Sequence, residues 1–173
     1  VLTSRGLGDV YKRQVTDSDE VTNYEFGWKS VLNDGKLRFN GSLFFVDISG
    51  LQTTIFDPSI ANLFFSDNAA DAEITGLEGD FLYYPNIDGL IISGAFSFLD
   101  TEIKKSLTTS DVVAGKELAF APGFQANFVA RYEWGLAAGN QGHAQAQVNW
   151  SDESFSDIIE PNKAKQDSYC LLY

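Results

Sequence analysis

The stretch FQANFVARYEW, residues 124–134, alternates apolar and polar side chains without a break. Its even-numbered positions are aromatic or small and apolar: Phe124, Ala126, Phe128, Ala130, Tyr132 and Trp134. Its odd-numbered positions are mostly polar: Gln125, Asn127, Val129, Arg131 and Glu133. Successive side chains of a β-strand point to opposite faces of a sheet. An alternation of period two therefore predicts a strand with one apolar and one polar face.

The same alternation recurs on both sides of this stretch and predicts an all-β chain. The expected strands lie at about 22–34, 36–53, 70–85, 89–105, 120–135 and 142–155. Short connections with turn-forming residues separate three pairs of them: NDG at 33–35, NIDG at 86–89 and AAGNQG at 137–142. Such residues favour tight hairpins. Long connections are expected at about 54–69 and 106–119, so the fold predicted is an antiparallel up-and-down meander of about six strands.

Strand length and the placement of aromatic residues favour a membrane β-barrel. Globular strands average roughly 5–6 residues, whereas a tilted membrane strand needs roughly 9–11. Short turns at one end and long loops at the other are typical of outer-membrane barrels. Tyr83, Tyr132 and Trp134 lie near short turns, and Tyr24 and Trp150 lie at the opposite strand ends. A secreted β-sandwich binding module, for example for carbohydrate, remains the alternative, because its half-buried strands alternate in the same way.

Composition excludes several other classes of protein. The 173 residues include 12 Lys and Arg against 24 Asp and Glu, which gives a formal net charge of -12. A chain this acidic repels phosphate backbones, so no nucleic-acid partner is expected. No stretch approaches the roughly 18 consecutive apolar residues of a membrane helix. The single cysteine, Cys170, can form no disulfide within the chain.

The sequence offers few candidates for catalysis. His143 is the only histidine, one residue past a short turn on the polar face of a predicted strand. The run GLEGD at 76–80 places Glu78 and Asp80 on one strand face, where a polar lining is a simpler interpretation than acid and base catalysis. Motifs of serine hydrolases, P-loops and dinucleotide-binding folds are missing. We therefore predict no enzyme, no catalytic residue and no cofactor.

Other charged residues have structural interpretations. Asp67, Asp71 and Glu73 lie near a predicted loop but lack the spacing of a calcium-binding loop, so no metal site is predicted. The charged residues of the polar face are Arg38, Glu78, Asp80, Arg131 and Glu133. We expect them to face a hydrated interior and to form cross-strand pairs worth roughly 0.2–1 kcal/mol each.

The two ends of the chain differ from its body. Residues 1–14, VLTSRGLGDVYKRQ, hold three basic residues and one acid, and GLGDVYKRQ resembles a translated sequencing-adaptor tag. The closing SYCLLY at 168–173 resembles the matching tag at the other edge. The domain organisation expected is a non-native leader at 1–14, a partial barrel at 15–166 and a non-native tail at 167–173.

Four segments of the body resemble the TonB-dependent receptors of Gram-negative outer membranes. They occur in the family's order: EVTNYEFGWK at 20–29, KLRFNGSLFFVDISGLQ at 36–52, NAADAEITGLE at 68–78 and APGFQANFVARYEW at 121–134. The resemblance implies a section from the C-terminal half of a barrel of about 22 strands with a plugged lumen. It further implies the outer membrane as location and its lipid as a partner.

The resemblance also implies a function. The whole protein would take up a scarce ligand of the siderophore, vitamin B12 or oligosaccharide class, driven by the TonB complex through a plug domain that these residues do not contain. Phe56, Phe64 and Phe65, in the first long connection, are the expected apolar contacts to this unknown ligand. A passive porin-like barrel remains a second alternative, because its strands alternate in the same way.

Six strands cannot close so large a barrel. We therefore expect an open, curved antiparallel sheet with one apolar face, unpaired edges and little conventional core. The long connections should project from one end, and residues 1–14 should pack on nothing.

Overall fold

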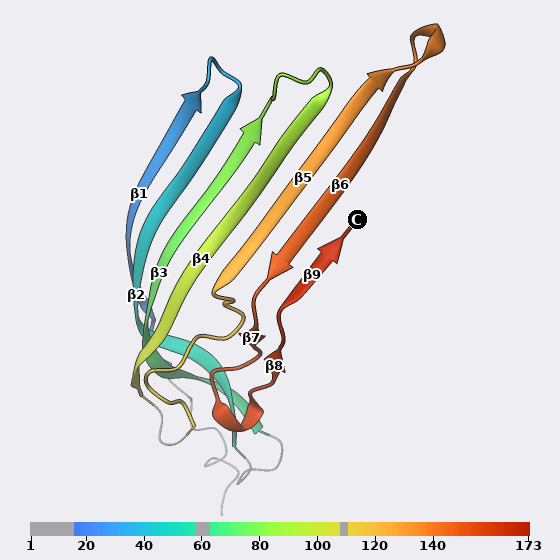
Figure 1. The fold of residues 1–173 in the computed structure, drawn as a ribbon. Helices are drawn as coiled ribbons and strands as arrows, with labels where there is room; N and C mark the ends of the chain where they lie inside the picture. Colours follow the sequence, from blue (N-terminus) through green and yellow to red (C-terminus); the bar gives the residue numbers. More distant parts are fainter. Residues whose placement is uncertain (1–15, 58–62, 108–110) are drawn as a thin grey trace, which may run out of the picture.

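The protein is described from a computed structural model that covers residues 16–57, 63–107 and 111–173. One antiparallel sheet dominates it, with the strand order β1-β2-β3-β4-β5-β6-β9 (Figure 1). Its strands are β1 (Glu20–Leu32), β2 (Leu37–Asp57), β3 (Leu63–Tyr83), β4 (Leu90–Ser106), β5 (Phe124–Gly135), β6 (Gln141–Ser151) and β9 (Tyr169–Leu172). The all-β meander expected from the alternation is confirmed.

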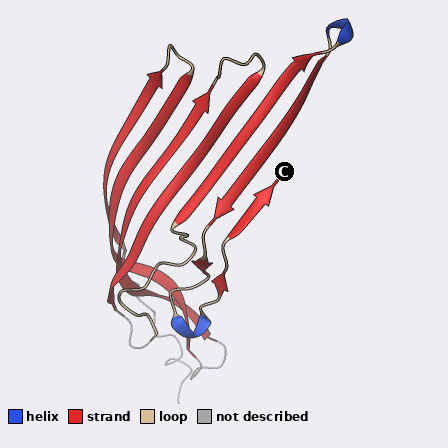
Figure 2. Cartoon of the chain, viewed as in Figure 1, coloured by secondary structure: helices blue, strands red, loops and turns tan. Residues whose placement is uncertain are grey.

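The remaining elements are short. β7 (Ser154–Phe155) and β8 (Lys165–Gln166) form a separate two-stranded ribbon. Two 3-10 turns, η2 (Ala137–Gly139) and η3 (Glu160–Asn162), are the helical segments of the described residues (Figure 2). None of the described helical segments has the length and apolar character needed to cross a membrane.

The register places the apolar residues of neighbouring strands directly opposite one another. One row across the sheet runs from Phe26 through Leu43, Leu77 and Phe98 to Phe124. The rings of Phe98 and Phe124 stack with centroids 4.5 Å apart. This surface, called the apolar face below, is not covered by a second layer: Phe128 is 44% exposed and Trp150 41%. The sandwich alternative is therefore wrong for the described residues, because a sandwich buries such a face.

The short turns lie together at one end of the sheet, as the sequence predicted (Figure 1). In the first of them Asn33, Asp34 and Gly35 all have positive φ, at 52°, 54° and 88°. Asn, Asp and Gly tolerate this left-handed region better than other residues do. At the second turn, a Cβ on Gly89 would lie 2.0 Å from the carbonyl oxygen of Glu133. Only glycine allows that close approach of the turn to β5.

The first long connection differs from the expectation. Residues 54–57 and 63–69 were predicted to lie in a loop, yet they extend β2 and β3, with Thr54 paired to Ser66 and Asp57 to Leu63. Strand pairing here follows the backbone ladder and not an alternating pattern, which is why the sequence did not reveal it. β2 and β3 each contain 21 residues. At about 3.4 Å per residue, each strand is ~70 Å long along its backbone, well beyond the ~30 Å hydrocarbon core of a bilayer.

A seventh strand lies at the edge of the sheet. β9 comes from the closing segment of the chain, and its four residues pair with 148–151 of β6. The main chain of Gln147 and Tyr173 continues this pairing. An edge strand presents unpaired N–H and C=O groups, and β9 satisfies part of that edge. Whether residues 167–173 originate from a tag stays a prediction, and residues 1–14 lie outside the described residues.

Cross-strand pairs of an aromatic residue and a glycine recur through the sheet. A Cβ on Gly41, Gly76, Gly79, Gly94 or Gly142 would meet the ring directly opposite at 2.1–2.8 Å. The rings belong, in the same order, to Trp28, Phe44, Phe96, Phe81 and Trp134. Each ring lies over the bare glycine backbone and shields the ladder there, a known way of stabilising glycine in sheets. Four pairs lie on the apolar face, and only that of Phe44 lies on the other face.

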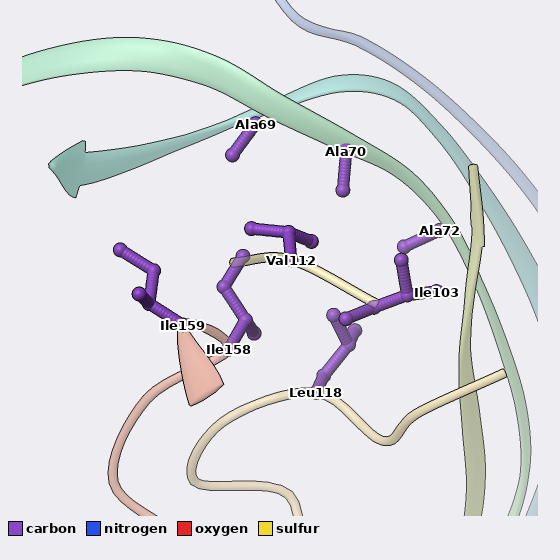
Figure 3. Close-up of a cluster of buried hydrophobic side chains, with 8 residues drawn as sticks. All are labelled: Ala69, Ala70, Ala72, Ile103, Val112, Leu118, Ile158 and Ile159. Carbon is purple, nitrogen blue, oxygen red and sulfur yellow. The ribbon is translucent and has the colours of Figure 1, made fainter. Parts of the chain in front are cut away.

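The buried core sits at the end opposite the short turns. It consists of eight apolar residues: Ala69, Ala70, Ala72, Ile103, Val112, Leu118, Ile158 and Ile159 (Figure 3). Four segments supply them: β3, β4, the connection between β4 and β5, and the segment after β6. Little conventional core was expected, and the rest of the sheet agrees with that expectation.

Candidate functional site

The polar face of the sheet, opposite the apolar face, forms a hollow of about 910 Å³. Most of the lining side chains alternate with those of the apolar face along β1 to β6 and β9. The polar members of the lining are Glu25, Lys29, Asn40, Ser42, Glu78, Asp80, Ser97, Gln125, Asn127, Asn149, Ser151 and Tyr169. The sheet therefore presents a hydrated, concave surface on one side and an apolar surface on the other.

Hydrogen bonds between neighbouring strands order this polar face. The Ser42 hydroxyl donates to Glu78 Oε1 at 3.1 Å, and Asn40 Nδ2 donates to Asp80 Oδ2 at 3.0 Å. Further along the sheet, Asn127 Nδ2 donates to Asn149 Oδ1 at 2.6 Å. Each bond links side chains that are directly opposite in the register. The carboxylates of Glu78 and Asp80 are thus each held by a neutral donor.

The predicted cross-strand charge pairs are wrong. Arg131 pairs with Glu133 at 2.7 Å, but both belong to β5 and lie two residues apart. Among the described residues, Arg38 takes part in no ion pair. The register explains this result, because Arg38 faces Val31 and Leu82, not a carboxylate. His143 faces Glu133 across β5 and β6 at the short-turn end and is exposed.

The hollow carries a net negative charge. Its lining includes the carboxylates of Glu25, Glu78 and Asp80 against one ammonium, that of Lys29. None of these four groups belongs to an ion pair within the described residues. Three carboxylates that share a hollow with one ammonium leave excess negative charge, which attracts positive charge from whatever occupies the hollow. The hollow therefore suits a surface that carries basic groups.

Two of the motif segments meet on this face. Phe44, from the segment at 36–52, lies opposite Gly76, from the segment at 68–78. A Cβ on Gly76 would lie 2.1 Å from Cζ of Phe44, so the ring occupies the space that any other residue would fill. Glu78 follows Gly76 on the same face, two residues along β3. The pair thus fixes the strand next to an acidic side chain of the hollow.

A β-bulge lies where β2 and β3 leave the hollow, and side-chain hydrogen bonds hold it in place. Gly50 has φ of 72°, and the register shifts between Ile48 and Gln52. Asn68 Nδ2 donates to Gly50 O at 2.6 Å and to Asp17 O at 3.0 Å, and Asn68 Oδ1 accepts from Asp17 N at 2.9 Å. Asp71 Oδ1 accepts from Gly50 N at 2.9 Å. One asparagine thus holds the bulge and the entry to β1 together, a role that the sequence did not reveal.

The acidic residues considered for calcium have other partners. Asp71 caps the bulge, Asp67 Oδ1 accepts the hydrogen bond of Asn68 N at 2.9 Å, and Glu73 pairs with Lys104 at 3.3 Å. Across the described residues, no group of three or more His, Cys, Asp or Glu is placed to hold a metal ion.

The predicted ligand contacts Phe56, Phe64 and Phe65 lie in the extended part of β2 and β3. The backbone register pairs Phe56 with Phe64, and Phe65 with Ile55. They belong to strands and not to the loop that was expected. Their side chains lie outside the described residues, so their contact with a ligand stays a prediction.

An open antiparallel sheet with one uncovered apolar face, one hydrated concave face, short turns at one end and long connections at the other is a section of a transmembrane β-barrel wall. The family model of the TonB-dependent receptor-like β-barrel matches residues 15–172. The chain therefore belongs to the TonB-dependent receptor family. Members of this family are receptors and transporters of the outer membrane and not enzymes, so the sheet is a section of an outer-membrane barrel.

Solved structures of this family resemble the chain in fold. The siderophore receptor PiuA of Acinetobacter baumannii shares 19% identity with a TM-score of 0.67, over 92% of this chain and 22% of PiuA. The ferric yersiniabactin uptake receptor FyuA of Yersinia pestis shares 16% identity with a TM-score of 0.70, over 89% of this chain and 21% of FyuA. The ferric preacinetobactin receptor BauA of A. baumannii shares 22% identity with a TM-score of 0.64, over 88% and 21%. The chain spans about a fifth of the length of these receptors.

Proposed function

We propose that this chain is part of the barrel of an active outer-membrane transporter that takes up a scarce ligand, with a ferric siderophore as the first candidate. The observation that carries the proposal is the match of the receptor barrel to residues 15–172. The three similar structures are a siderophore receptor, a ferric yersiniabactin uptake receptor and a ferric preacinetobactin receptor, which favours this class over vitamin B12 or an oligosaccharide.

The two faces of the sheet take different partners in this proposal. The apolar face contacts outer-membrane lipid, where Tyr132 and Trp134, stacked at 5.9 Å beside a short turn, suit the lipid–water interface. The hollow faces the plug domain inside the barrel. Because Glu25, Glu78 and Asp80 carry no ionic partner from the sheet, the plug surface opposite them carries basic side chains. The TonB complex drives transport through that plug.

Uptake of radiolabelled iron tests the proposal. The full-length gene product that contains this segment is expressed in a Gram-negative strain that lacks its own ferric-siderophore receptors. We expect saturable uptake of at least one ferric siderophore and loss of that uptake in the matched strain without TonB. Uptake of small sugars that does not need TonB would support the passive porin instead. Recovery of the protein in the soluble periplasm would exclude both.

A pair of glutamate variants tests the role assigned to the hollow. Glu78→Gln removes a carboxylate from the lining of the hollow. Glu73→Gln removes a carboxylate from the same strand that pairs with Lys104 and does not line the hollow. We expect Glu78→Gln to lower TonB-dependent uptake while the barrel still inserts, and Glu73→Gln to leave uptake within about twofold of the original. Equal uptake by both variants would remove the hollow from the transport mechanism.

A further inference from the structure

The connection between β4 and β5 and the segment after β6 pack as one unit at the end of the sheet far from the short turns. We call residues 111–123 and 152–166 the shelf; it includes β7, β8 and η3. Thr101 and Ile103 of β4, against which the shelf packs, share the face of Ser97 and hence of the hollow. The shelf therefore lies at the end of the polar face and covers its margin (Figure 1).

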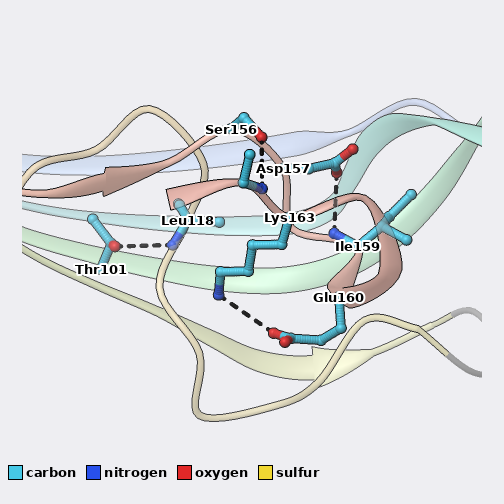
Figure 4. Close-up of polar contacts among 8 residues, drawn as sticks. Thr101, Leu118, Ser156, Asp157, Ile159, Glu160 and Lys163 are labelled. Atoms are coloured by element: carbon cyan, nitrogen blue, oxygen red, sulfur yellow. Dashed lines mark hydrogen bonds and ion pairs between the residues drawn. The ribbon is translucent and has the colours of Figure 1, made fainter. Parts of the chain in front are cut away.

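The shelf first continues the hydrogen-bonded edge of β4. β5 pairs with β4 only as far as Phe98. Beyond that point, Leu99 N donates to Gly123 O at 2.9 Å, Ile103 N to Lys116 O at 2.8 Å, and Gly115 N to Ile103 O at 2.8 Å. The buried hydroxyl of Thr101 accepts from Leu118 N at 3.1 Å (Figure 4). Backbone groups that would otherwise form an open edge are thus paired by the shelf.

The two segments of the shelf are also bonded to each other. Val112 and Ile159 form an antiparallel bridge, and Glu160 N donates to Asp111 O at 2.9 Å. Phe120 N donates to Phe155 O at 2.8 Å. Four of the eight core residues come from the shelf: Val112, Leu118, Ile158 and Ile159. In Figure 3 their side chains converge on Ala69, Ala70, Ala72 and Ile103 of the barrel wall.

Polar contacts order the second segment internally. The Lys163 side chain is only 11% exposed, and its Nζ lies 3.3 Å from Glu160 Oε1 and 4.0 Å from the centre of the Phe155 ring. Ala164 N donates to the Ser156 hydroxyl at 3.0 Å (Figure 4). Ile159 N likewise donates to Asp157 Oδ1 at 3.0 Å. These bonds hold the ribbon of β7 and β8 and the η3 turn in one conformation.

We propose that the shelf is a fixed part of the extracellular end of the receptor, the end at which outer-membrane barrels carry their long loops. The shelf stays docked on the barrel wall with and without ligand, and ligand-dependent movement at this end occurs in other loops. Mobile segments have few buried apolar contacts and many exposed backbone bonds. The shelf has the opposite properties, because both segments share one core and one ladder. The proposal assumes the transport function given above, since it assigns a part in that transport.

Hydrogen exchange of the full-length receptor in micelles tests the docking without any transport measurement. The amides of Gly115, Leu118 and Ile159, like those of the β3–β4 ladder, should exchange at least about 100-fold more slowly than in an unstructured peptide. Their rates should change less than threefold on adding a ferric siderophore that the receptor transports. Rates near those of the peptide, or a tenfold change on adding ligand, would overturn the proposal.

A matched pair of variants checks that hydrogen exchange at Leu118 reports the contact between the shelf and Thr101 of β4. Thr101→Val removes the hydroxyl that accepts from Leu118 N, whereas Thr75→Val makes the same change at an exposed position of β3. An acceptor lost inside the core weakens protection by about tenfold at Leu118. Thr75→Val should leave that rate unchanged. Equal rates at Leu118 in both variants would contradict the docked arrangement.

A reversible disulfide between the two segments of the shelf then tests whether those segments separate during transport. Val112→Cys with Ile159→Cys places two thiols at bridged positions. Directly opposite Cα atoms lie about 4.5–5.5 Å apart, within the range for a disulfide. Uptake by the oxidised form should stay within twofold of uptake by the same variant after reduction. A tenfold loss of uptake on oxidation, restored by reduction, would overturn the proposal of a fixed shelf.

If neither form of the variant nor the unmodified receptor takes up iron, the result contradicts the proposed transport function. The hydrogen-exchange test of the shelf does not depend on that result.

Discussion

The two ends of the sheet are stabilised in different ways. Toward the short turns the sheet is one layer thick, and Phe128 and Tyr132 each stay 44% exposed. At the other end Ile103 and Ala72, on the same β3–β4 ladder, are completely buried. The first end depends on surroundings that the chain does not provide, namely lipid and the remaining barrel strands. The second end supplies its own core, so its stability is encoded within the chain.

The comparison shows that a barrel wall can contain a locally stable region. Burying a side chain such as Ile103 contributes about 1.5–3 kcal/mol. In contrast, Phe128 on the apolar face is still 44% exposed and completes its burial only against lipid. Removing side chains from each end should therefore have different consequences in the same receptor.

The largest effect is expected when a side chain is removed from the core between the shelf and the barrel wall. Ile103→Ala should lower the free energy of opening of the shelf by about 2–5 kcal/mol, because it leaves a cavity under a fully buried side chain. Hydrogen exchange at Leu118 measures this free energy in the full-length receptor. Phe128→Ala, on the apolar face, is the control and should leave the exchange of Leu118 unchanged. Similar losses from both variants would mean that the two ends unfold as one unit.

A second prediction concerns the aromatic ring over Gly76. Gly76→Ala should destabilise the sheet by about 1–3 kcal/mol, because the new Cβ would lie 2.1 Å from the Phe44 ring. Gly135→Ala is the matched control, since nothing lies within 4 Å of a Cβ there. Adding Phe44→Ala should recover part of the loss in a double-mutant cycle followed by chemical denaturation. Additive losses would show that the ring and the glycine do not interact.

A smaller loss of stability is expected when Asn68, which holds the β-bulge, is replaced. Asn68→Ala should destabilise the extended part of β2 and β3 by about 1–2 kcal/mol, because Asp17 N and Gly50 O lose the Asn68 side chain as partner, while Asp17 O keeps only the hydrogen bond from Gln52 Nε2. Asn68→Asp keeps the acceptor for Asp17 N and should have an intermediate effect. Exchange of the amides in 51–54 reports the change. If Asn68→Asp proved more harmful than Asn68→Ala, the donors of Asn68 could not be the only important groups.

The smallest effect is expected from an exposed ion pair of the shelf. Lys165 Nζ lies 2.6 Å from Glu153 Oε2, and this hydrogen bond raises the pKa of Lys165 above its ordinary value of 10.5. A raised lysine pKa stabilises the folded shelf below that ordinary value, and the contribution is lost as pH rises through the raised pKa. The stability of the shelf in Glu153→Gln should thus fall slightly below that of the original protein at pH 8, and the two stabilities should converge once the pH exceeds the raised pKa of Lys165. A difference that persists above that pH would assign the effect to something other than Lys165.

The sequence predicted the strands that alternate most regularly. The expected 120–135 and 142–155 correspond to Phe124–Gly135 and Gln141–Ser151. The face of each residue was also correct, because side chains in a strand alternate by local geometry alone. The prediction failed where pairing does not follow the pattern of side chains, as at 54–57 and 63–69. It also failed for the charge pairs of Arg38, since a partner depends on register and not on the residue itself.

What the sequence determined by itself is the class of the protein: period-two alternation, turn residues such as Asn33–Gly35, and four motif segments identify a receptor barrel. These are local features, readable a few residues at a time. Only the tertiary structure decided that Phe44 covers Gly76, that Asn68 clamps Gly50 and Asp17, and that the shelf closes over Ile103. Those contacts join residues that are far apart along the chain. Their existence depends on how strands bend and pair, which no local pattern of residues specifies.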